Sequence, residues 1–513
     1  MEERKFNGKK SFDKGGKKPF NKDKKSFDKG DRKPFNKDKK SFDKGDRKPF
    51  NKDKGFNKDR KFNDKGGKKS FNKDRKPFDK KEQVEEVKNV ETSVRYYAYL
   101  CLYKVYVEKA YSNIEIDHVI RENKINELDA KLLTNIVYGT LSHNKLLNWE
   151  ISKLSEKAPK DQAKIILLMS LYQKRFLDRI PEFAIINEAV AVAKKVGGDA
   201  MGNFVNAILR ESQRQNLEFN KEDCKDEYEY LSIAYNMPVW VIKMWETHYG
   251  KEKTLNLLKA NLQEAPLSTR VNIHKANKEL IKENPDFIDG NLAKNSLIYT
   301  GSTPIAQTEV MKKGLVSVQD ESSQYVVEVL DPQENDKVLD MCAAPGSKTQ
   351  YISELMNNTG KVLALDIHPH RVEIMKKYLT NLQLTNVTCV CYDSTKLHEK
   401  SKLVGSFDKV LLDAPCLGLG VIRRKPDIAL SLQGEKLDEI LLLQAKLLEE
   451  AYLMLKDGGT LVYSTCSVNK KENDAQITAF LGKHSDMKRV FEKQIFPFDY
   501  NSDGFYICKL IKE

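Results

Sequence analysis

Two cysteines stand in unusual sequence contexts, fifty residues apart. Cys416 ends the run Asp413-Ala-Pro-Cys416, and Cys466 lies within Tyr463-Ser-Thr-Cys466-Ser467. Each run follows an apolar stretch that is typical of a buried strand. In an open α/β sheet, ligands bind at the carboxyl ends of neighbouring strands. Two thiols and a carboxylate at such an edge therefore indicate covalent chemistry on a substrate rather than packing.

Strand-like and helix-like patterns alternate through residues 321–513. The expected strands are Lys337–Cys342, Lys361–Asp366, Val387–Tyr392, Lys409–Leu412 and Thr460–Tyr463. The expected helices are Lys348–Met356, His370–Leu382, Lys436–Leu455 and Lys471–Gly482. This alternation predicts an α/β domain with a doubly wound, Rossmann-like parallel sheet. The segment Phe505–Leu510 is expected to add a late antiparallel strand at the edge of that sheet.

Acidic residues end the first three expected strands. Asp340 belongs to the first strand, Asp366 ends the second, and Asp393 follows the third. An acid after the second strand suits ribose hydroxyls, and three such acids predict an adenosine-type cofactor in the strand-end crevice. The turn after the first strand contains glycine and precedes a helix, so a ligand can approach its backbone N–H groups. Its candidate cofactor-binding residues are Cys342, Ala343, Ala344, Pro345, Gly346, Ser347 and Lys348.

The first 90 residues are a basic repeat segment without Leu, Ile, Tyr or Trp before residue 84. Residues 9–23, 24–38 and 39–53 are near-identical copies of one unit rich in Lys, Asp and Phe. Residues 1–80 hold 31 of the 88 Lys and Arg and 14 of the 74 Asp and Glu, leaving 57 basic and 60 acidic residues for the remainder. We expect this segment to be disordered. It is either a tether that finds RNA or a solubilising tail.

Two further regions separate this segment from the expected sheet. Residues 91–235 predict an all-helical domain, with apolar side chains at helical spacing and a helix stop at Gly197-Gly198. Residues 236–320 predict a small α+β subdomain, in which Arg270 either contacts RNA or bridges to the sheet. Eight cysteines without a CxxC pair, and no apolar stretch of bilayer length, predict a cytoplasmic protein with reduced thiols and no metal site.

Several of these motifs resemble known families. The segments Asp340–Thr349, Asp413–Gly420, Tyr463–Ser467 and Glu472-Asn473 resemble RNA (cytosine-5)-methyltransferases. The segments Tyr172-Gln173, Ile186–Val190 and Asn203–Arg210 resemble the NusB family of RNA-binding antitermination proteins. The two together are similar to the Sun/RsmB type of enzyme, which modifies 16S ribosomal RNA. One departure is Ser347, where the family usually has glycine; this residue is tolerated unless it needs a positive φ.

The resemblance implies roles that the residues alone leave open. Carbon 5 of cytosine is too poor a nucleophile to attack a methyl group, and a thiolate added at carbon 6 activates it. Either cysteine could supply that thiolate on chemical grounds. The family implies S-adenosyl-L-methionine as cofactor, Cys466 as nucleophile, Cys416 as the thiol that assists release, and Asp413 on the cytosine edge. Asp413 is also placed in the cofactor site, and Lys348 is expected to position the cofactor or the base.

The resemblance also implies an RNA partner, which is 16S rRNA before full subunit assembly, bound by a monomer. The cationic run Arg423-Arg424-Lys425 follows the Cys416 loop and suits phosphate contact. Two alternatives remain: the same chemistry on transfer RNA or large-subunit rRNA, and an RNA-binding assembly factor with a vestigial fold. Intact Asp413, Cys416 and Cys466 argue against the second, because a binding module needs none of them.

Overall fold

The computed structural model of the protein describes residues 89–513. The predictions of disorder and of RNA tethering fall on the basic repeat segment, which lies outside the described residues. Within the described part of the chain, no helix combines the length and apolar character needed to cross a membrane. The same part contains no cluster of His, Cys, Asp and Glu arranged to hold a metal ion.

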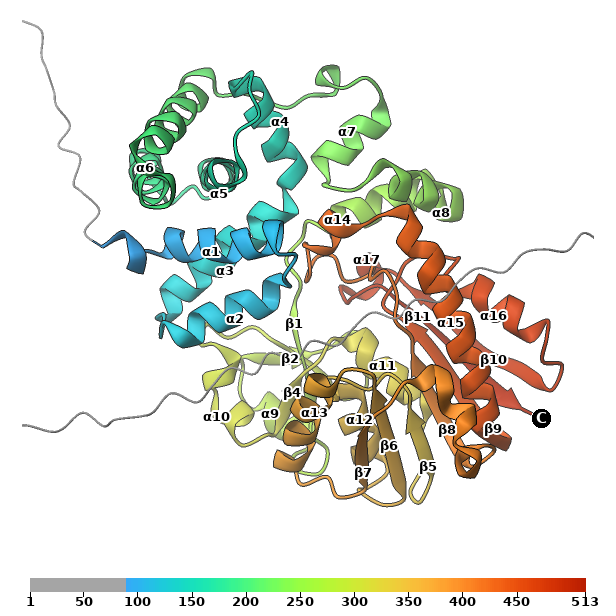
Figure 1. Cartoon of the computed structure of the whole chain (residues 1–513). Coiled ribbons are helices and arrows are strands. Elements are labelled where there is room, and N and C mark those ends of the chain that lie inside the picture. Colours follow the sequence, from blue (N-terminus) through green and yellow to red (C-terminus); the bar gives the residue numbers. More distant parts are fainter. Residues whose placement is uncertain (1–88) are drawn as a thin grey trace, which may run out of the picture. The chain divides into compact units, whose positions relative to one another are not determined.

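The region after the repeat segment is helical, as predicted. Helix α5 (Asp161–Phe176) forms its centre, and every residue of α5 from 165 to 173 is buried. A helix that is apolar all round must be enclosed by others. The enclosing helices are α1 (Val94–Val107), α2 (Ser112–Glu122), α3 (Glu127–Ser142), α4 (Asn144–Leu154) and α6 (Glu182–Gln215). They form one bundle with a continuous apolar core (Figure 1).

Helix α6 contains the helix stop that the sequence predicts. The sequence predicts a stop at Gly197-Gly198, and the span Glu182–Gln215 consists of two helices that meet at a kink there. Gly198 alone leaves helical geometry, with φ 79°. Glycine adopts a left-handed conformation without a Cβ penalty, so the axis kinks there without an intervening loop.

A small α+β region follows, as predicted, after α7 (Glu227–Ala234) and α8 (Val239–Ala260). Its antiparallel sheet has the strand order β2-β3-β1-β4. The strands are β1 (Leu267–Val271), β2 (Phe287–Asp289), β3 (Ser296–Tyr299) and β4 (Val316–Val318), with short helices α9 (Lys278–Lys282) and α10 (Glu309–Lys312). Phe287, Leu297 and Val316 contribute to its own small apolar core.

The last region contains a seven-stranded sheet in the order β10-β11-β9-β8-β5-β6-β7. Its parallel strands are β5 (Lys337–Asp340), β6 (Lys361–Asp366), β7 (Val387–Cys391), β8 (Phe407–Asp413) and β9 (Leu455–Thr465). The antiparallel strands are β10 (Met487–Ile495) and β11 (Phe505–Lys512). Placing the edge at β11 is therefore wrong, because β10 pairs outside it. Five of the nine residues of strand β10 are polar and only its two end residues are buried, so its sequence carries no apolar strand signal.

Helices cover both faces of this sheet (Figure 1). Leu411 and Val462 pack with α11 (Glu321–Leu330) and α12 (Ser347–Leu355) on one face. Val410 and Leu461, one residue earlier, pack with α15 (Gly434–Met454) and α16 (Asp474–Leu481) on the other. Helix α13 (Pro369–Asn381) covers β6 and β7. Because successive side chains of a strand point to opposite faces, an apolar strand packs against the helices on both faces of the sheet. The doubly wound fold is confirmed.

Candidate active site

The strand order locates the crevice in which a ligand can bind. From β5 the chain moves outward through β6 and β7, then returns to the opposite side of β5 as β8 and continues to β9. The order therefore reverses between β5 and β8. In open α/β sheets, ligands bind outside the carboxyl ends of the strands at such a switch point. Asp340 ends β5 and Asp413 ends β8, so both acids belong to this crevice.

The two cysteines of interest meet beside this crevice. Cys416 follows β8 and Cys466 follows β9, and these strands are parallel neighbours with Asp413 opposite Ser464. The Sγ atoms of the two cysteines lie 3.3 Å apart. Both residues are partly exposed. One small substrate group can therefore contact both thiols, although fifty residues separate them in the chain.

A charged pair lies at the end of β8. The Lys348 ammonium donates to Asp413 Oδ2 over 2.8 Å, and the Ser464 hydroxyl donates to Asp413 Oδ1 over 2.7 Å. Both carboxylate oxygens thus have a partner that fixes their orientation. Lys348 comes from the first turn of α12, so the turn after β5 is tied directly to the strand that leads to Cys416.

One of the two thiols, Cys416, and the nearby Lys348 have shifted pKa values. The hydrogen bond between the thiols, together with burial, raises the pKa of Cys416 well above its ordinary value. Cys416 therefore keeps its proton at neutral pH. Burial alone would lower the pKa of Lys348, but the adjacent carboxylate of Asp413 outweighs it and raises that pKa. Lys348 is therefore a cation under the same conditions, and it lies within electrostatic reach of Cys466.

Asp340 is a buried acid with an unused oxygen. Its Oδ2 accepts a hydrogen bond from the Thr349 hydroxyl over 2.8 Å, while Oδ1 is buried and has no partner among the described residues. Burial raises the pKa of Asp340 to about 7. A buried carboxylate oxygen is costly to leave unsatisfied, so a hydrogen-bond donor of a bound ligand is the partner that this position lacks.

The other two strand-end acids lie where the sequence placed them, at β6 and β7. Asp366 accepts the His368 backbone N–H over 2.9 Å and pairs with Arg371 over 3.1 Å. Arg371 also donates to the Ala344 carbonyl over 2.7 Å, which links this acid to the turn after β5. Asp393 accepts from the backbone N–H and hydroxyl of Thr395, so it caps the short helix that follows β7. Carboxylates have lone pairs left for a ligand after such contacts.

The turn after β5 explains why Gly346 and Ser347 occupy their positions. Gly346 has φ 106°, a left-handed conformation that favours glycine, and an added Cβ would approach Met375 to 2.9 Å. Ser347 is the first residue of α12 and is not among the residues with positive φ. The serine that departs from the family pattern is therefore accommodated without strain. The close-fitting backbone at Gly346 is the type of surface that a cofactor can approach.

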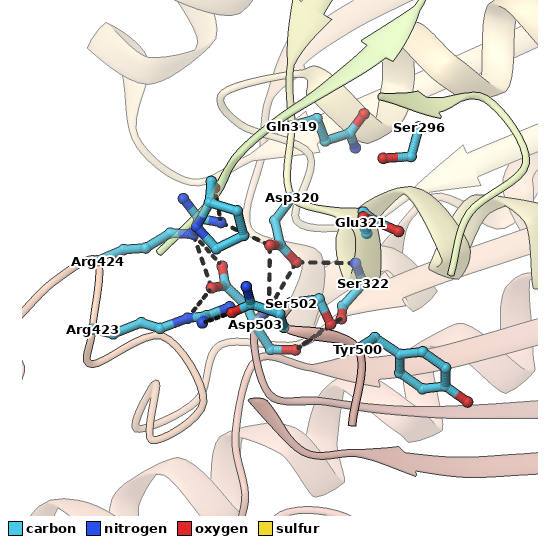
Figure 2. A network of polar contacts seen from close by, with 12 residues as sticks. Ser296, Gln319, Asp320, Glu321, Ser322, Arg423, Arg424, Tyr500, Ser502 and Asp503 are labelled. Carbon is cyan, nitrogen blue, oxygen red and sulfur yellow. Dashed lines mark hydrogen bonds and ion pairs between the residues drawn. The ribbon is translucent and has the colours of Figure 1, made fainter. Parts of the chain in front are cut away.

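The cationic run after Cys416 forms a mostly internal network. Figure 2 shows Arg424 reaching Asp320 and Asp503, and Arg423 pairs with Asp503. Arg424 donates to both oxygens of Asp503, over 2.8 and 3.0 Å, and to Asp320 Oδ2 over 2.9 Å. The Arg423 side chain is 1% exposed. The structure thus contradicts phosphate contact by Arg423 and favours a structural role for Arg424, whereas Lys425 is exposed.

Arg270 also lies inside the protein. Its side chain has no exposed surface and lies 3.4 Å from a Glu354 oxygen. The guanidinium carbon lies 4.2 Å from the ring centre of Tyr351. A fully buried guanidinium cannot reach a phosphate, so the prediction of RNA contact at Arg270 is wrong. These contacts agree with the alternative role of Arg270, a bridge to the sheet, because Glu354 and Tyr351 belong to α12, which covers one face of the seven-stranded sheet.

The network in Figure 2 leads to a prediction about stability. Arg424→Ala leaves the buried carboxylates of Asp320 and Asp503 without their shared cation. We expect a loss of about 3 kcal/mol in the free energy of unfolding, measured by chemical denaturation of the full chain. Lys425→Ala is the matched control, and as an exposed substitution it should change stability by less than about 0.5 kcal/mol. If Arg424→Ala instead leaves the stability unchanged and weakens RNA binding, Arg424 contacts RNA.

Sequence reasoning missed three residues that shape the site. Ser464 and Arg371 orient acids at the strand ends, and Glu472 accepts hydrogen bonds from both cysteine loops. Glu472 and Ser464 lie inside motifs on which the family resemblance rests, and their place in those motifs could have pointed to a role in the site. Arg371 had no such signal, because its contacts depend on how α13 packs against the turn after β5.

Comparisons with known proteins agree with this geometry. A model of the family described as 16S rRNA methyltransferase RsmB/F matches residues 327–511. A NusB family model matches residues 92–214, and a model of the RsmF/B-like ferredoxin-like domain matches residues 237–284. Among solved structures, that titled "Crystal Structure of PH0851" has TM-score 0.72 and 25% identity, covering 82% of this chain and 98% of that chain.

Curated relatives extend this agreement over the chain. The "Probable ribosomal RNA small subunit methyltransferase B" of Bacillus subtilis (strain 168) is 36% identical over 447 residues, which span 82% of this chain and 99% of the relative. A protein of the same name from Synechocystis is 32% identical, with the same two coverages. Identity above 30% over nearly the whole of these relatives shows that the chain belongs to the RsmB/F family of 16S rRNA methyltransferases.

Proposed function

We propose that this enzyme transfers a methyl group from S-adenosylmethionine to carbon 5 of a cytosine in 16S rRNA, through a covalent bond to Cys466. The observation that carries the proposal is the pair of thiols 3.3 Å apart, beside the ion pair of Lys348 and Asp413. Methylation of a nucleic-acid oxygen or amino group needs no thiol. Carbon 5 of cytosine does, because addition at carbon 6 gives carbon 5 the electron density that it lacks.

The electrostatics of the site favour Cys466 over Cys416 as the nucleophile. A thiol attacks as its thiolate, and the raised pKa of Cys416 keeps that thiol protonated at neutral pH. Cys416 is therefore suited to donate or exchange a proton. Lys348 carries its positive charge within electrostatic reach of Cys466, so a cation lies close to the proposed attacking sulfur.

Asp413 and Lys348 are proposed to hold the other edge of the base. When Cys466 Sγ bonds to carbon 6, the electron pair of the 5,6 double bond moves to carbon 5, and a hydrogen bond or proton at nitrogen 3 stabilises the adduct. The paired side chains of Asp413 and Lys348 offer that hydrogen bond next to the thiols. After methylation a base removes the proton on carbon 5, the double bond re-forms, and Cys466 leaves as a thiolate. Cys416 assists that release.

The crevice between β5 and β8 fits the methyl donor. When bound, S-adenosylmethionine supplies an electrophilic methyl group. Asp366 has free lone pairs for ribose hydroxyls, and Asp393 is placed to accept from an adenine amino group. The unpartnered oxygen of Asp340 and the tight backbone at Gly346 support a ligand in the same crevice. The rest of the turn, from Cys342 to Lys348, would border it.

RNA contact is proposed for Lys425 and for the helical bundle. A cavity of about 1060 Å³ lies among helices α1, α4 and α7 and the residues before α15. Its lining combines cations with aromatic rings: Lys109, Lys145, Lys164, Lys225, Lys436, Tyr106, Tyr111 and Trp149. Lysines contact phosphates and aromatic rings stack on unpaired bases. The target cytosine must leave its stack to reach thiols set in the strand-end crevice.

Bisulfite sequencing of 16S rRNA tests the proposed function directly. In a strain that lacks this gene we expect one 5-methylcytosine to disappear from 16S rRNA and to return when the wild-type chain is expressed. The Cys466→Ala chain, expressed to the same level, should not restore it. An unchanged 16S pattern would contradict the proposal, and loss of 5-methylcytosine from transfer RNA or large-subunit rRNA in the same samples would reassign the substrate.

A further inference from the structure

Glu472 is a buried acid that lies between β9 and α16, has no exposed surface, and contacts the chain segments carrying both cysteines. Its Oε1 accepts the Leu417 backbone N–H over 2.8 Å. Its Oε2 accepts the Ser467 hydroxyl over 2.6 Å and the Asn469 amide over 2.9 Å. Leu417 follows Cys416 directly, and Ser467 follows Cys466 directly. One carboxylate is thus hydrogen-bonded to the residue after each thiol.

We propose that Glu472 is a positioning residue that holds the two cysteine loops in register, so that both thiols can act on one base. The proposal rests on the proposed function, because it assigns Glu472 to the same two-thiol site. Glu472 is not a catalytic residue in this account, since its oxygens contact the loops and neither thiol. Its role is to fix the separation between Cys416 and Cys466, which is 3.3 Å between the Sγ atoms.

The type of residue supports this role more than a packing role does. Burying a carboxylate is costly unless hydrogen bonds compensate for lost water. In the described part of the chain, no salt bridge involves Glu472, and burial raises its pKa. The hydrogen bonds to its carboxylate come instead from the loops that follow the cysteines. An apolar side chain would fill the same space without that cost, so the carboxylate is used for its capacity to accept several directed hydrogen bonds.

A second hydrogen bond also connects the two cysteine loops, so Glu472 is not the only contact between them. The Gly420 backbone N–H donates to the Cys466 carbonyl over 3.0 Å. This bond lies farther along the loop, and it depends on Gly420, where an added Cβ would meet the Gly504 carbonyl oxygen at 1.9 Å. Changing Glu472 should therefore loosen the segment nearest the thiols and leave the rest of the loop attached.

Diamide oxidation of the full-length protein tests the position of the thiols without relying on methylation. Two thiols that touch form an Sγ–Sγ bond by giving two electrons and two protons to diamide, which becomes its hydrazine. The Cys416–Cys466 disulfide is then quantified against time by mass spectrometry of peptides. In Glu472→Gln an NH2 group replaces one carboxylate oxygen. In either orientation it faces a donor, the Leu417 N–H or the Asn469 amide, so at least one hydrogen bond is lost. We expect disulfide formation to slow about tenfold.

Glu450→Gln is the matched control. Glu450 is another buried glutamate, on α15. It accepts the His398 backbone N–H over 2.7 Å, and its side-chain hydrogen bonds are with His398 rather than with either cysteine loop. Disulfide formation in this variant should match the wild type. Glu472→Ala removes both acceptor oxygens and all three hydrogen bonds, and it should slow the reaction further. If this variant does not fold, Glu472→Gln decides alone.

Two results distinguish this proposal from the proposed function. Disulfide formation at the wild-type rate in folded Glu472→Gln would overturn the positioning role, whether or not the enzyme methylates cytosine. Where the protein methylates rRNA, a fall in kcat of about tenfold with an unchanged KM supports the role, because the loss then affects the reacting geometry and spares RNA binding. A rise in KM alone would overturn it. If bisulfite sequencing shows no change in 16S rRNA, the proposed substrate is withdrawn. The diamide experiment still reports the position of the two thiols in that case.

Discussion

Replacing Cys466 with alanine is expected to lower methylation of 16S rRNA by several orders of magnitude, because the variant has no atom that can bond to carbon 6. The same variant should form no covalent adduct with RNA that contains 5-azacytidine. This nucleoside traps the enzyme because position 5 of its ring is a nitrogen, which has no proton to lose when the cysteine should leave. Adducts are read as a slow-migrating protein band in denaturing gels. Folding should be unaffected, since Cys466 is partly exposed and makes its one side-chain hydrogen bond to Cys416.

Cys224→Ala is the control for the loss of a thiol as such. Cys224 is partly exposed and lies before α7, outside the catalytic sheet. Its variant should methylate and form the adduct like the wild type. If Cys466→Ala still forms the adduct while Cys416→Ala does not, the roles of the two thiols are reversed.

The sheet could be predicted from the sequence because its strands are buried on both faces. Val410 and Leu411 point to opposite helical layers, so the strand reads as an apolar run of recognisable length. The acids that end these strands were placed correctly for the same reason. Strand β10 was missed because it forms the edge of the sheet, where five of its nine residues are polar and only its two end residues are buried. The position of β11 inside the sheet could not be inferred without it.

The cationic residues show where sequence reasoning stops. A run of cations beside a catalytic loop is equally consistent with phosphate contact and with internal ion pairs. The choice depends on Asp320 and Asp503, which lie 104 and 79 residues away from Arg424 in the chain. The role of Arg270 likewise depends on Glu354, which is 84 residues away in the chain. Partners this distant come together only through the packing of three regions, and no local pattern reveals them.

Cys416→Ala is expected to have the opposite signature to Cys466→Ala: a covalent protein–RNA adduct should accumulate on ordinary, unmodified rRNA. Cys416 holds its proton at neutral pH and lies 3.3 Å from the attacking sulfur, so it is placed to assist the steps that break the bond between Cys466 and carbon 6. Without it, addition and methyl transfer proceed and release slows. The measurement is a denaturing gel of enzyme incubated with rRNA and S-adenosylmethionine, with ribonuclease digestion to confirm that the shifted band contains RNA.

The double variant Cys416→Ala with Cys466→Ala identifies which sulfur carries the trapped RNA. If Cys466 forms the bond, the double variant shows no adduct, although the single Cys416 variant accumulates it. An adduct that persists in the double variant would place the bond on a third residue. A Cys416→Ala enzyme that turns over at the wild-type rate without adduct would contradict the release role. In that case the contact between the thiols would serve chiefly to keep Cys416 protonated and Cys466 alone available for attack.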